Sequence, residues 1–159
     1  MTKLQNACIT VYIVYALGAV LQFFDRTMLA GLIAITLAGF IANQNRKNVK
    51  GTVFESHLRW MNRTLWIGAL VIVPLAVILT GVMIFVFTDA ASFVHALLSG
   101  NPHIISSAIK KYFSGNMMRI SVIAYITTAL PVTWVVHRCW RGYVLAHAGK
   151  PVENVTRWF

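Results

Sequence analysis

Four long apolar stretches, separated by polar connections, organise the chain. They cover about residues 7–24, 27–42, 65–87 and 120–137. A helix needs about 20 mainly apolar residues to cross a bilayer, and it can tilt or extend polar end residues to the headgroups. A helix also satisfies its backbone polar groups within the segment, as the lipid interior requires. The pattern therefore predicts an all-α, polytopic membrane protein with four transmembrane helices.

The last two predicted spans each contain a proline. Pro74 lies in the third span and Pro131 in the fourth. Proline has no N–H to donate to the carbonyl four residues earlier, so it frees the carbonyls of Leu70 and Thr127. We expect kinks at these two points.

An amphipathic stretch, residues 51–66, precedes the third span and has the sequence GTVFESHLRWMNRTLW. Thr52 and Glu55 have the spacing of a capping box, so a helix should begin at Val53. One side of this helix is apolar, another side is charged, and a third set of residues lies between them. This predicts a cytoplasmic amphipathic helix that leads into the third span. The apolar side comprises Phe54, Leu58, Met61 and Leu65, the charged side comprises Glu55, Arg59, Asn62, Arg63 and Trp66, and His57, Trp60 and Thr64 lie between.

The connection between the third and fourth spans, residues 88–119, is long enough for structure of its own. Asp89 is placed to begin a short helix that continues to Ser99, and residues 105–113 form a second apolar side with lysines opposite. Two amphipathic pieces lying on the outer surface of the membrane fit this pattern best. A lid over an opening and a docking surface for a partner remain alternatives.

Composition agrees with a membrane protein. Apolar residues make up 58% of the 159 residues and charged residues only 11%, whereas about a quarter of an ordinary soluble domain is charged. No linker, repeat or low-complexity tract divides the chain, so residues 1–159 are expected to form a single domain.

The formal net charge of +10 is distributed unevenly along the chain. Most of the 14 Lys and Arg residues lie at the N-terminus, in the second connection with its amphipathic helix, and in the tail, residues 138–159. The positive-inside rule then predicts that both termini are cytoplasmic. Basic residues beside spans are explained by orientation and by contact with the lipid bilayer and its anionic headgroups, so we expect no nucleic-acid partner.

Two motifs resemble a known family. The first is G-T-x-x-E-S-H-x-R-W-x-x-R-T-x-W, from Gly51 to Trp66. The second, from Arg138 to Pro151, follows R-x-x-R-G-x-x-L-x-x-x-G-R-P except that Lys150 stands in place of the last Arg. They resemble small bacterial multi-pass inner-membrane proteins of uncharacterised function, which are distantly similar to the membrane component of the chloroplast inner-envelope protein translocon. The resemblance implies a multi-pass fold and a bacterial inner-membrane location. It implies no reaction, and the connection 88–119 is longer than the family leads us to expect.

Candidate chemistry is sparse. The chain has four carboxylates, none inside a predicted span, and it has no motif typical of hydrolases, metalloproteases or phosphate-binding loops. Cys8 and Cys139 are interpreted as packing residues. His57 and His137 are the pair of histidines that could face each other as haem ligands, which is too little to predict a cofactor. We therefore expect no enzyme activity, no cofactor and no metal site.

Small residues recur on the second predicted span. Alanines recur every four residues there, with glycines beside them. Small residues at this spacing let two helix backbones approach closely in lipid, where dispersion forces hold helices together. We expect them to pack against another helix of the same chain, and a contact between subunits of a homo-oligomer is the alternative. The residues are Ala30, Gly31, Ala34, Ala38, Gly39 and Ala42.

These observations predict a non-enzymatic accessory or scaffold subunit of the inner membrane. It would contact a membrane-protein partner or anionic lipid through a cytoplasmic Arg and Trp cluster, in which Glu55 is expected to pair with Arg138 or Arg141. The alternative function, which follows from the translocon resemblance, is a pore or translocation-type channel subunit. The predicted contact residues are Glu55, His57, Arg59, Trp60, Arg63, Trp66, Arg138 and Arg141.

Overall fold

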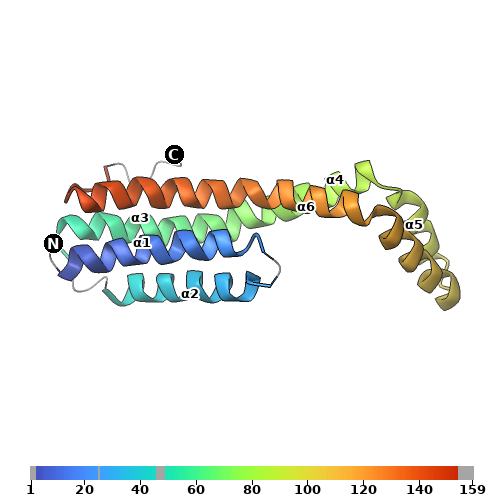
Figure 1. Ribbon diagram of the computed structural model, residues 1–159, viewed down its shortest axis with the longest axis horizontal. Helices are drawn as coiled ribbons and strands as arrows, with labels where there is room; N and C mark the ends of the chain where they lie inside the picture. The colour runs from blue at the N-terminus through green and yellow to red at the C-terminus, as the bar shows by residue number, and fades with distance from the viewer. Residues whose placement is uncertain (1–2, 25, 46–48, 154–159) are drawn as a thin grey trace. The chain divides into compact units, whose positions relative to one another are not determined.

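The computed structural model describes residues 3–24, 26–45 and 49–153, and within these ranges it contains helices and short connections but no strand. It forms two compact units, residues 1–73 with 131–159 and residues 74–130. Figure 1 labels the helices along the chain. Their bounds are α1 Lys3–Leu21, α2 Met28–Asn45, α3 Val53–Ile67, the π-helical turn η1 Gly68–Ile72, α4 Val73–Phe87, α5 Ala90–Leu98 and α6 Pro102–His147.

Four helical segments are long and apolar enough to cross a membrane, in agreement with the four predicted spans. Their bounds differ from the predicted ones. The third segment is continuous from the amphipathic helix through the span, and the fourth is much longer than residues 120–137 because it is helical over 46 residues. The segments are Lys3–Leu21, Met28–Asn45, Val53–Phe87 and Pro102–His147.

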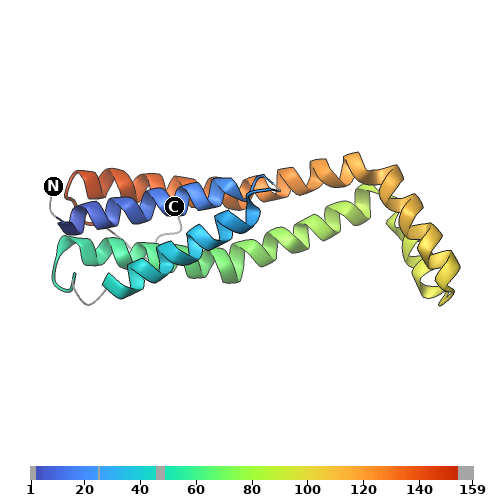
Figure 2. The ribbon, with the colours of Figure 1, turned by 60° about the horizontal axis from the view of Figure 1, so that its bottom comes forward.

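In the first unit, α1 and α2 pack side by side, as both Figure 1 and Figure 2 show. Their backbones touch where Gly18 of α1 meets Gly31 of α2. A Cβ atom added to Gly18 would lie 2.9 Å from the carbonyl oxygen of Gly31, and one added to Gly31 would lie 2.6 Å from the carbonyl oxygen of Gly18. Real Cβ contacts essentially never come this close, so the approach requires glycine at both positions.

Most of the small residues of α2 lie against other helices of the same chain. Gly31, Ala38 and Ala42 are buried, and Ala34 is half-buried beside Gly18 of α1. Gly39 is half-buried against the side chain of Leu65 in α3. Ala30 is exposed, so it lies outside this packing face. Ala30 belongs to the series of alanines that recur every four residues, but the small residues of α2 that face Gly18 of α1 are Gly31 and Ala34.

Helix α3 begins at Val53, as predicted, but its buried face is wider than the apolar stripe. Leu58 and Met61 are buried, while Phe54 and Leu65 are only half-buried. The residues placed between the two sides, His57, Trp60 and Thr64, are the most buried of the helix. A hydrophobicity pattern misses this face because each of these side chains carries a polar atom.

The third segment widens into a π-helical turn just before Pro74. The N–H of Val73 donates to the carbonyl of Gly68, five residues earlier. This turn contains Leu70, whose carbonyl has no proline N–H to accept from. The helix is therefore irregular near the point where the sequence predicts a kink, whereas α6 continues as a helix through Pro131.

The second unit contains α4 from Pro74, α5, and α6 as far as Leu130. Helix α5 follows Asp89, as predicted, and ends at Leu98, one residue before the predicted end at Ser99. Asp89 makes no side-chain cap. Helix α6 begins at Pro102, where the Oδ1 atom of Asn101 accepts the N–H of His103 at 3.0 Å. The second predicted amphipathic piece, residues 105–113, is therefore helical but continuous with the fourth span. The predicted loop 88–119 is mostly helix.

Side-chain contacts hold the helices of the second unit together. The Thr80 hydroxyl of α4 donates to the Thr127 hydroxyl of α6 at 2.7 Å, and the hydroxyls of Thr88 and Tyr112 are 2.6 Å apart. Phe93 of α5 stacks on Tyr112 with ring centroids 4.5 Å apart. These polar and aromatic contacts fix the pairing of helices whose remaining apolar side chains are largely exposed.

Candidate functional site

The start of α3 differs in detail from a capping box. Thr52 occupies the N-cap position, but its hydroxyl donates to the carbonyl of Val49 at 2.6 Å instead of accepting an N–H of the first turn. Glu55 reaches back to the N–H of Gly51, at 2.9 Å, rather than to that of Thr52. Gly51 has a φ of +77°, which favours glycine and turns the chain into the helix. The predicted start is thus confirmed and the predicted cap is wrong.

Glu55 forms an ion pair with Arg59, one turn further along α3, at 2.6 Å. The expected pairing of Glu55 with Arg138 or Arg141 is wrong. Its carboxylate is already held by the Gly51 N–H and Arg59, on the exposed side of the helix, whereas Arg138 is turned into the interior. Arg59 lies one helical turn from Glu55, so the two side chains meet without moving either charge out of water.

The interior of the first unit contains a buried arginine cluster, which we define as Arg138 with Trp60, Thr64 and Trp134. Arg138 is 1% exposed, and its guanidinium carbon lies 3.6 Å from the ring centroid of Trp60 and 5.1 Å from that of Trp134. Its Nε–H donates to the hydroxyl of Thr64 at 2.9 Å, and that hydroxyl donates in turn to the carbonyl of Trp60 at 2.8 Å. Cation–π contacts and a directed hydrogen bond offset the cost of burying the charge.

Trp60 completes this cluster from the opposite direction. Its indole N–H donates to the carbonyl of Arg138 at 3.3 Å, so α3 and α6 are joined by contacts in both directions. Trp60 is itself 1% exposed. Trp60 and Arg138 were expected to contact a partner or lipid. In this structure they are buried and contact each other between α3 and α6. A buried side chain does not offer its surface to an external ligand.

A second set of contacts joins α3 to α1 and to the segment after α6. The Tyr12 hydroxyl lies 3.1 Å from Nδ1 of His57, and Nε2 of His57 lies 2.9 Å from the carbonyl oxygen of Lys150. This assigns Nε2 as the donor and Nδ1 as the acceptor of the Tyr12 hydroxyl proton. The N–H of Val152 donates to the hydroxyl of Ser56 at 3.0 Å. We call these three bonds the tail contact.

The tail contact explains how the two sequence motifs meet. Helix α6 ends in a turn at Gly149, whose φ of +66° favours glycine, and the Lys150 N–H donates to the carbonyl of Leu145 at 3.0 Å. This turn returns the chain to α3. Ser56 and His57 belong to the first motif, whereas Gly149 and Lys150 belong to the second. The two motifs are therefore two sides of one packed structure.

The remaining predicted contact residues lie nearer the surface. Arg59 and Trp66 are exposed, Trp66 to 54%, whereas Arg63 and Arg141 are half-buried. The guanidinium carbon of Arg141 is 5.9 Å from the ring centroid of Trp60, at the edge of the buried cluster. These four side chains form what we call the outer basic face of the first unit.

Several residues of these contacts were not among the predicted site residues. Tyr12 lies in the first predicted span, where an apolar pattern gives it no special role. Gly142 is buried against the Tyr12 ring, and any side chain at that position would overlap it. The second motif contains Gly142 directly after Arg141, so the motif could have identified Gly142 as a candidate packing residue. His57 and His137 do not form a pair, since His57 is buried and bonded whereas His137 is exposed.

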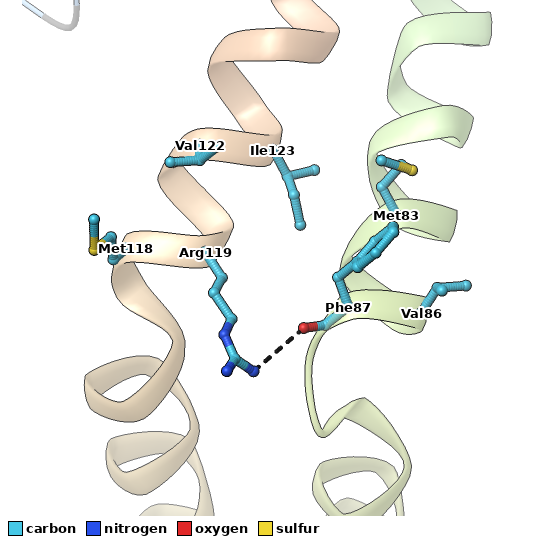
Figure 3. Close-up of a pocket in the computed structure, with 7 residues that line it drawn as sticks. All are labelled: Met83, Val86, Phe87, Met118, Arg119, Val122 and Ile123. Atoms are coloured by element: carbon cyan, nitrogen blue, oxygen red, sulfur yellow. Dashed lines mark hydrogen bonds between the residues drawn. The ribbon is translucent and has the colours of Figure 1, made fainter.

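The second unit has an apolar groove between α4 and α6, shown in Figure 3. Its volume is about 660 Å³, and its one charged lining residue, Arg119, donates to the carbonyl of Phe87 at 3.5 Å. An apolar lining of this kind can accommodate an apolar ligand such as an acyl chain, but it offers little to distinguish one apolar ligand from another. The lining residues are Met83, Val86, Phe87, Met118, Arg119, Val122 and Ile123.

Within the described residues, no group of three or more His, Cys, Asp or Glu side chains is placed to hold a metal ion. In comparisons with known proteins, no family model, curated protein or solved structure matches the chain. The family resemblance carried by the two motifs therefore stays a prediction.

Proposed function

We propose that this protein is a non-enzymatic accessory or scaffold subunit of the bacterial inner membrane, with both termini cytoplasmic. It would contact a membrane-protein partner or anionic lipid through the outer basic face, which comprises Arg59, Arg63, Trp66 and Arg141. The proposal narrows the predicted contact residues to those that are accessible.

The observation that supports this proposal is that the two faces of α3 differ, one being buried within the unit and the other exposed. One face, with His57, Trp60 and Thr64, is buried and bonded to α1, α6 and the segment after it. The opposite face presents the exposed Arg59 and Trp66. Arg and Trp are enriched at contact surfaces and at membrane interfaces, because each combines a polar tip with a large apolar body. A rigidly held helix with such a face suits recognition better than catalysis.

The packing of the first unit also favours a scaffold over a pore. Tyr12, Trp60 and Arg138 fill the space between α1, α3 and α6, and each is 1% exposed. A conducting path along this interior would require these large side chains to move. The pore alternative rests on the family resemblance.

Site-specific photo-crosslinking in native membranes tests the proposal. A photoreactive residue at Arg59 or at Trp66 should give an adduct of defined mass, whereas one at Leu29, an exposed residue of α2, should give none. The purified protein should not conduct ions in planar bilayers. Adducts of the same mass from all three positions, or reproducible conductance, would contradict the proposal.

A further inference from the structure

A groove with mixed character lies between the last turns of α6 and the segment after it, within the first unit. Its volume is about 760 Å³. We call it the polar groove, and it is separate from the apolar groove of Figure 3. Its lining residues are His137, Trp140, Arg141, Val144, Leu145, Lys150, Pro151 and Glu153.

Two cations from different elements converge on this groove. Arg141 lies on α6, and Lys150 follows the Gly149 turn that brings the chain back beside the helix. The bond from His57 to the Lys150 carbonyl fixes the backbone at that point, at 2.9 Å. Among the described residues the structure shows one ion pair, between Arg59 and Glu55, and neither groove cation belongs to it. Both cations line the same groove, and neither belongs to an ion pair among the described residues.

The rest of the lining is largely apolar and continues onto the outside of the unit. Trp140 is 65% exposed and Val144 is 47% exposed, one turn apart on α6. The Trp140 ring stacks on Tyr143, with ring centroids 5.8 Å apart. Exposed aromatic residues beside cations are typical of the headgroup level of a membrane. A ligand that fits both parts has an anionic head and an apolar chain.

Glu153, which also lines the polar groove, restricts which anionic headgroup the groove can bind. A carboxylate in the lining repels a bare phosphate, but it accepts hydrogen bonds from hydroxyl groups. Together with Arg141 and Lys150 it leaves the groove with a net charge that matches one phosphodiester. A glycerol headgroup supplies both the phosphodiester and the hydroxyls.

We infer that the polar groove binds a phosphatidylglycerol-type phospholipid. Arg141 and Lys150 contact its phosphodiester, Glu153 accepts its headgroup hydroxyls, and an acyl chain follows Trp140 and Val144. This inference rests on the proposed function in that it names the anionic lipid. The groove shares Arg141 with the outer basic face, whereas its other cation, Lys150, lies outside that face.

Native mass spectrometry of the full-length protein in detergent tests the inference. Both lipids carry the phosphodiester, but phosphatidylcholine has no headgroup hydroxyls for Glu153 and adds a quaternary ammonium that Arg141 and Lys150 repel. Phosphatidylglycerol should therefore bind about tenfold more tightly than phosphatidylcholine with the same acyl chains. The double variant Arg141→Gln/Lys150→Gln should lose this preference. The matched control Lys110→Gln/Lys111→Gln removes the same charge from exposed positions of the second unit and should keep it.

Two further measurements separate the groove from general effects. Lys150→Gln alone retains the backbone carbonyl that His57 contacts, so it should fold like the parent and still weaken phosphatidylglycerol binding. Inorganic phosphate should not compete with the lipid. The inference is overturned if phosphate competes, if both double variants lose the preference equally, or if the parent shows none. Crosslinking from Arg59 that persists in Lys150→Gln, which leaves the outer basic face unchanged, would leave the proposed function intact.

Discussion

Replacing Thr64 with Val removes one hydroxyl from the buried arginine cluster at almost constant volume. That hydroxyl donates to the Trp60 carbonyl at 2.8 Å and accepts the Arg138 Nε–H at 2.9 Å. The Trp60 carbonyl keeps its place in the helix, so the larger loss is on the guanidinium. A buried hydrogen bond to a charged group contributes about 1.5–3 kcal/mol. We expect a loss of about 2 kcal/mol in the free energy of unfolding, or about thirtyfold in the folded-to-unfolded ratio.

Equilibrium unfolding in detergent measures this loss, and Thr36→Val is its matched control. The Thr36 hydroxyl also donates to the carbonyl four residues earlier, Leu32, at 2.9 Å, but Thr36 is exposed. A double-mutant cycle of Thr64→Val with Arg138→Gln should be less than additive, because both changes remove the same bond. Equal losses for Thr64→Val and Thr36→Val, or additivity within about 0.3 kcal/mol, would refute the reasoning.

Three other predictions follow from the fold and the charge pattern. Reporter fusions at Val49 and at Gly100 should report opposite sides of the membrane, inside and outside, and the same side for both would overturn the four-span topology. Gly31→Ala should lower the melting temperature in detergent because of its backbone contact with α1, whereas Gly115→Ala, with nothing within 4 Å, should not; equal melting would contradict that contact. Glu55→Gln should leave the free energy of unfolding almost unchanged, since it breaks an exposed i, i+4 pair, and a loss as large as that of Thr64→Val would indicate a buried role.

The features that sequence predicted well depend on local chemistry. The beginning of α3 at Val53 was predicted from Gly51 and the Thr52–Glu55 spacing, which lie within a few positions of each other, although the Thr52 hydroxyl does not cap the helix. Helix α5 follows in the same way from Asp89 and a short apolar pattern. The irregular turn before Pro74 follows from a missing N–H. Each of these requires no knowledge of a distant part of the chain.

The features that sequence missed depend on what packs against what. An Arg beside a predicted span suggests an anchor at the surface, and nothing near Arg138 in the sequence shows that Trp60 will cover it 3.6 Å away. Glu55 has several cations within reach, and a pattern cannot choose among them. The continuity of α6 was missed because residues 114–119 separate the predicted amphipathic piece from the predicted fourth span, although no proline interrupts them.

The contacts of α1 show which part of α3 shares the depth of the first span. Tyr12 lies beside His57, and a Cβ atom added to Gly68 would lie 3.8 Å from the hydroxyl of Tyr15. If α1 crosses the bilayer, as its length and hydropathy indicate, then α3 between His57 and Gly68 lies beside it and not on the membrane surface. The third span then begins well before Leu65, nearer the first turn of α3.

This depth gives the polar residues of the first unit a common explanation. Arg138 then lies within the membrane domain, where two Trp rings and a hydroxyl replace its water. Arg59 lies nearer the start of α3, where its long side chain can reach the headgroups while it pairs with Glu55. Arg141 lies one turn beyond Arg138 toward the end of α6, and Lys150 lies beyond that end. The groove cations therefore lie nearer the end of α6 than the buried arginine does, and their long side chains can extend further toward the headgroups if α1 crosses the bilayer.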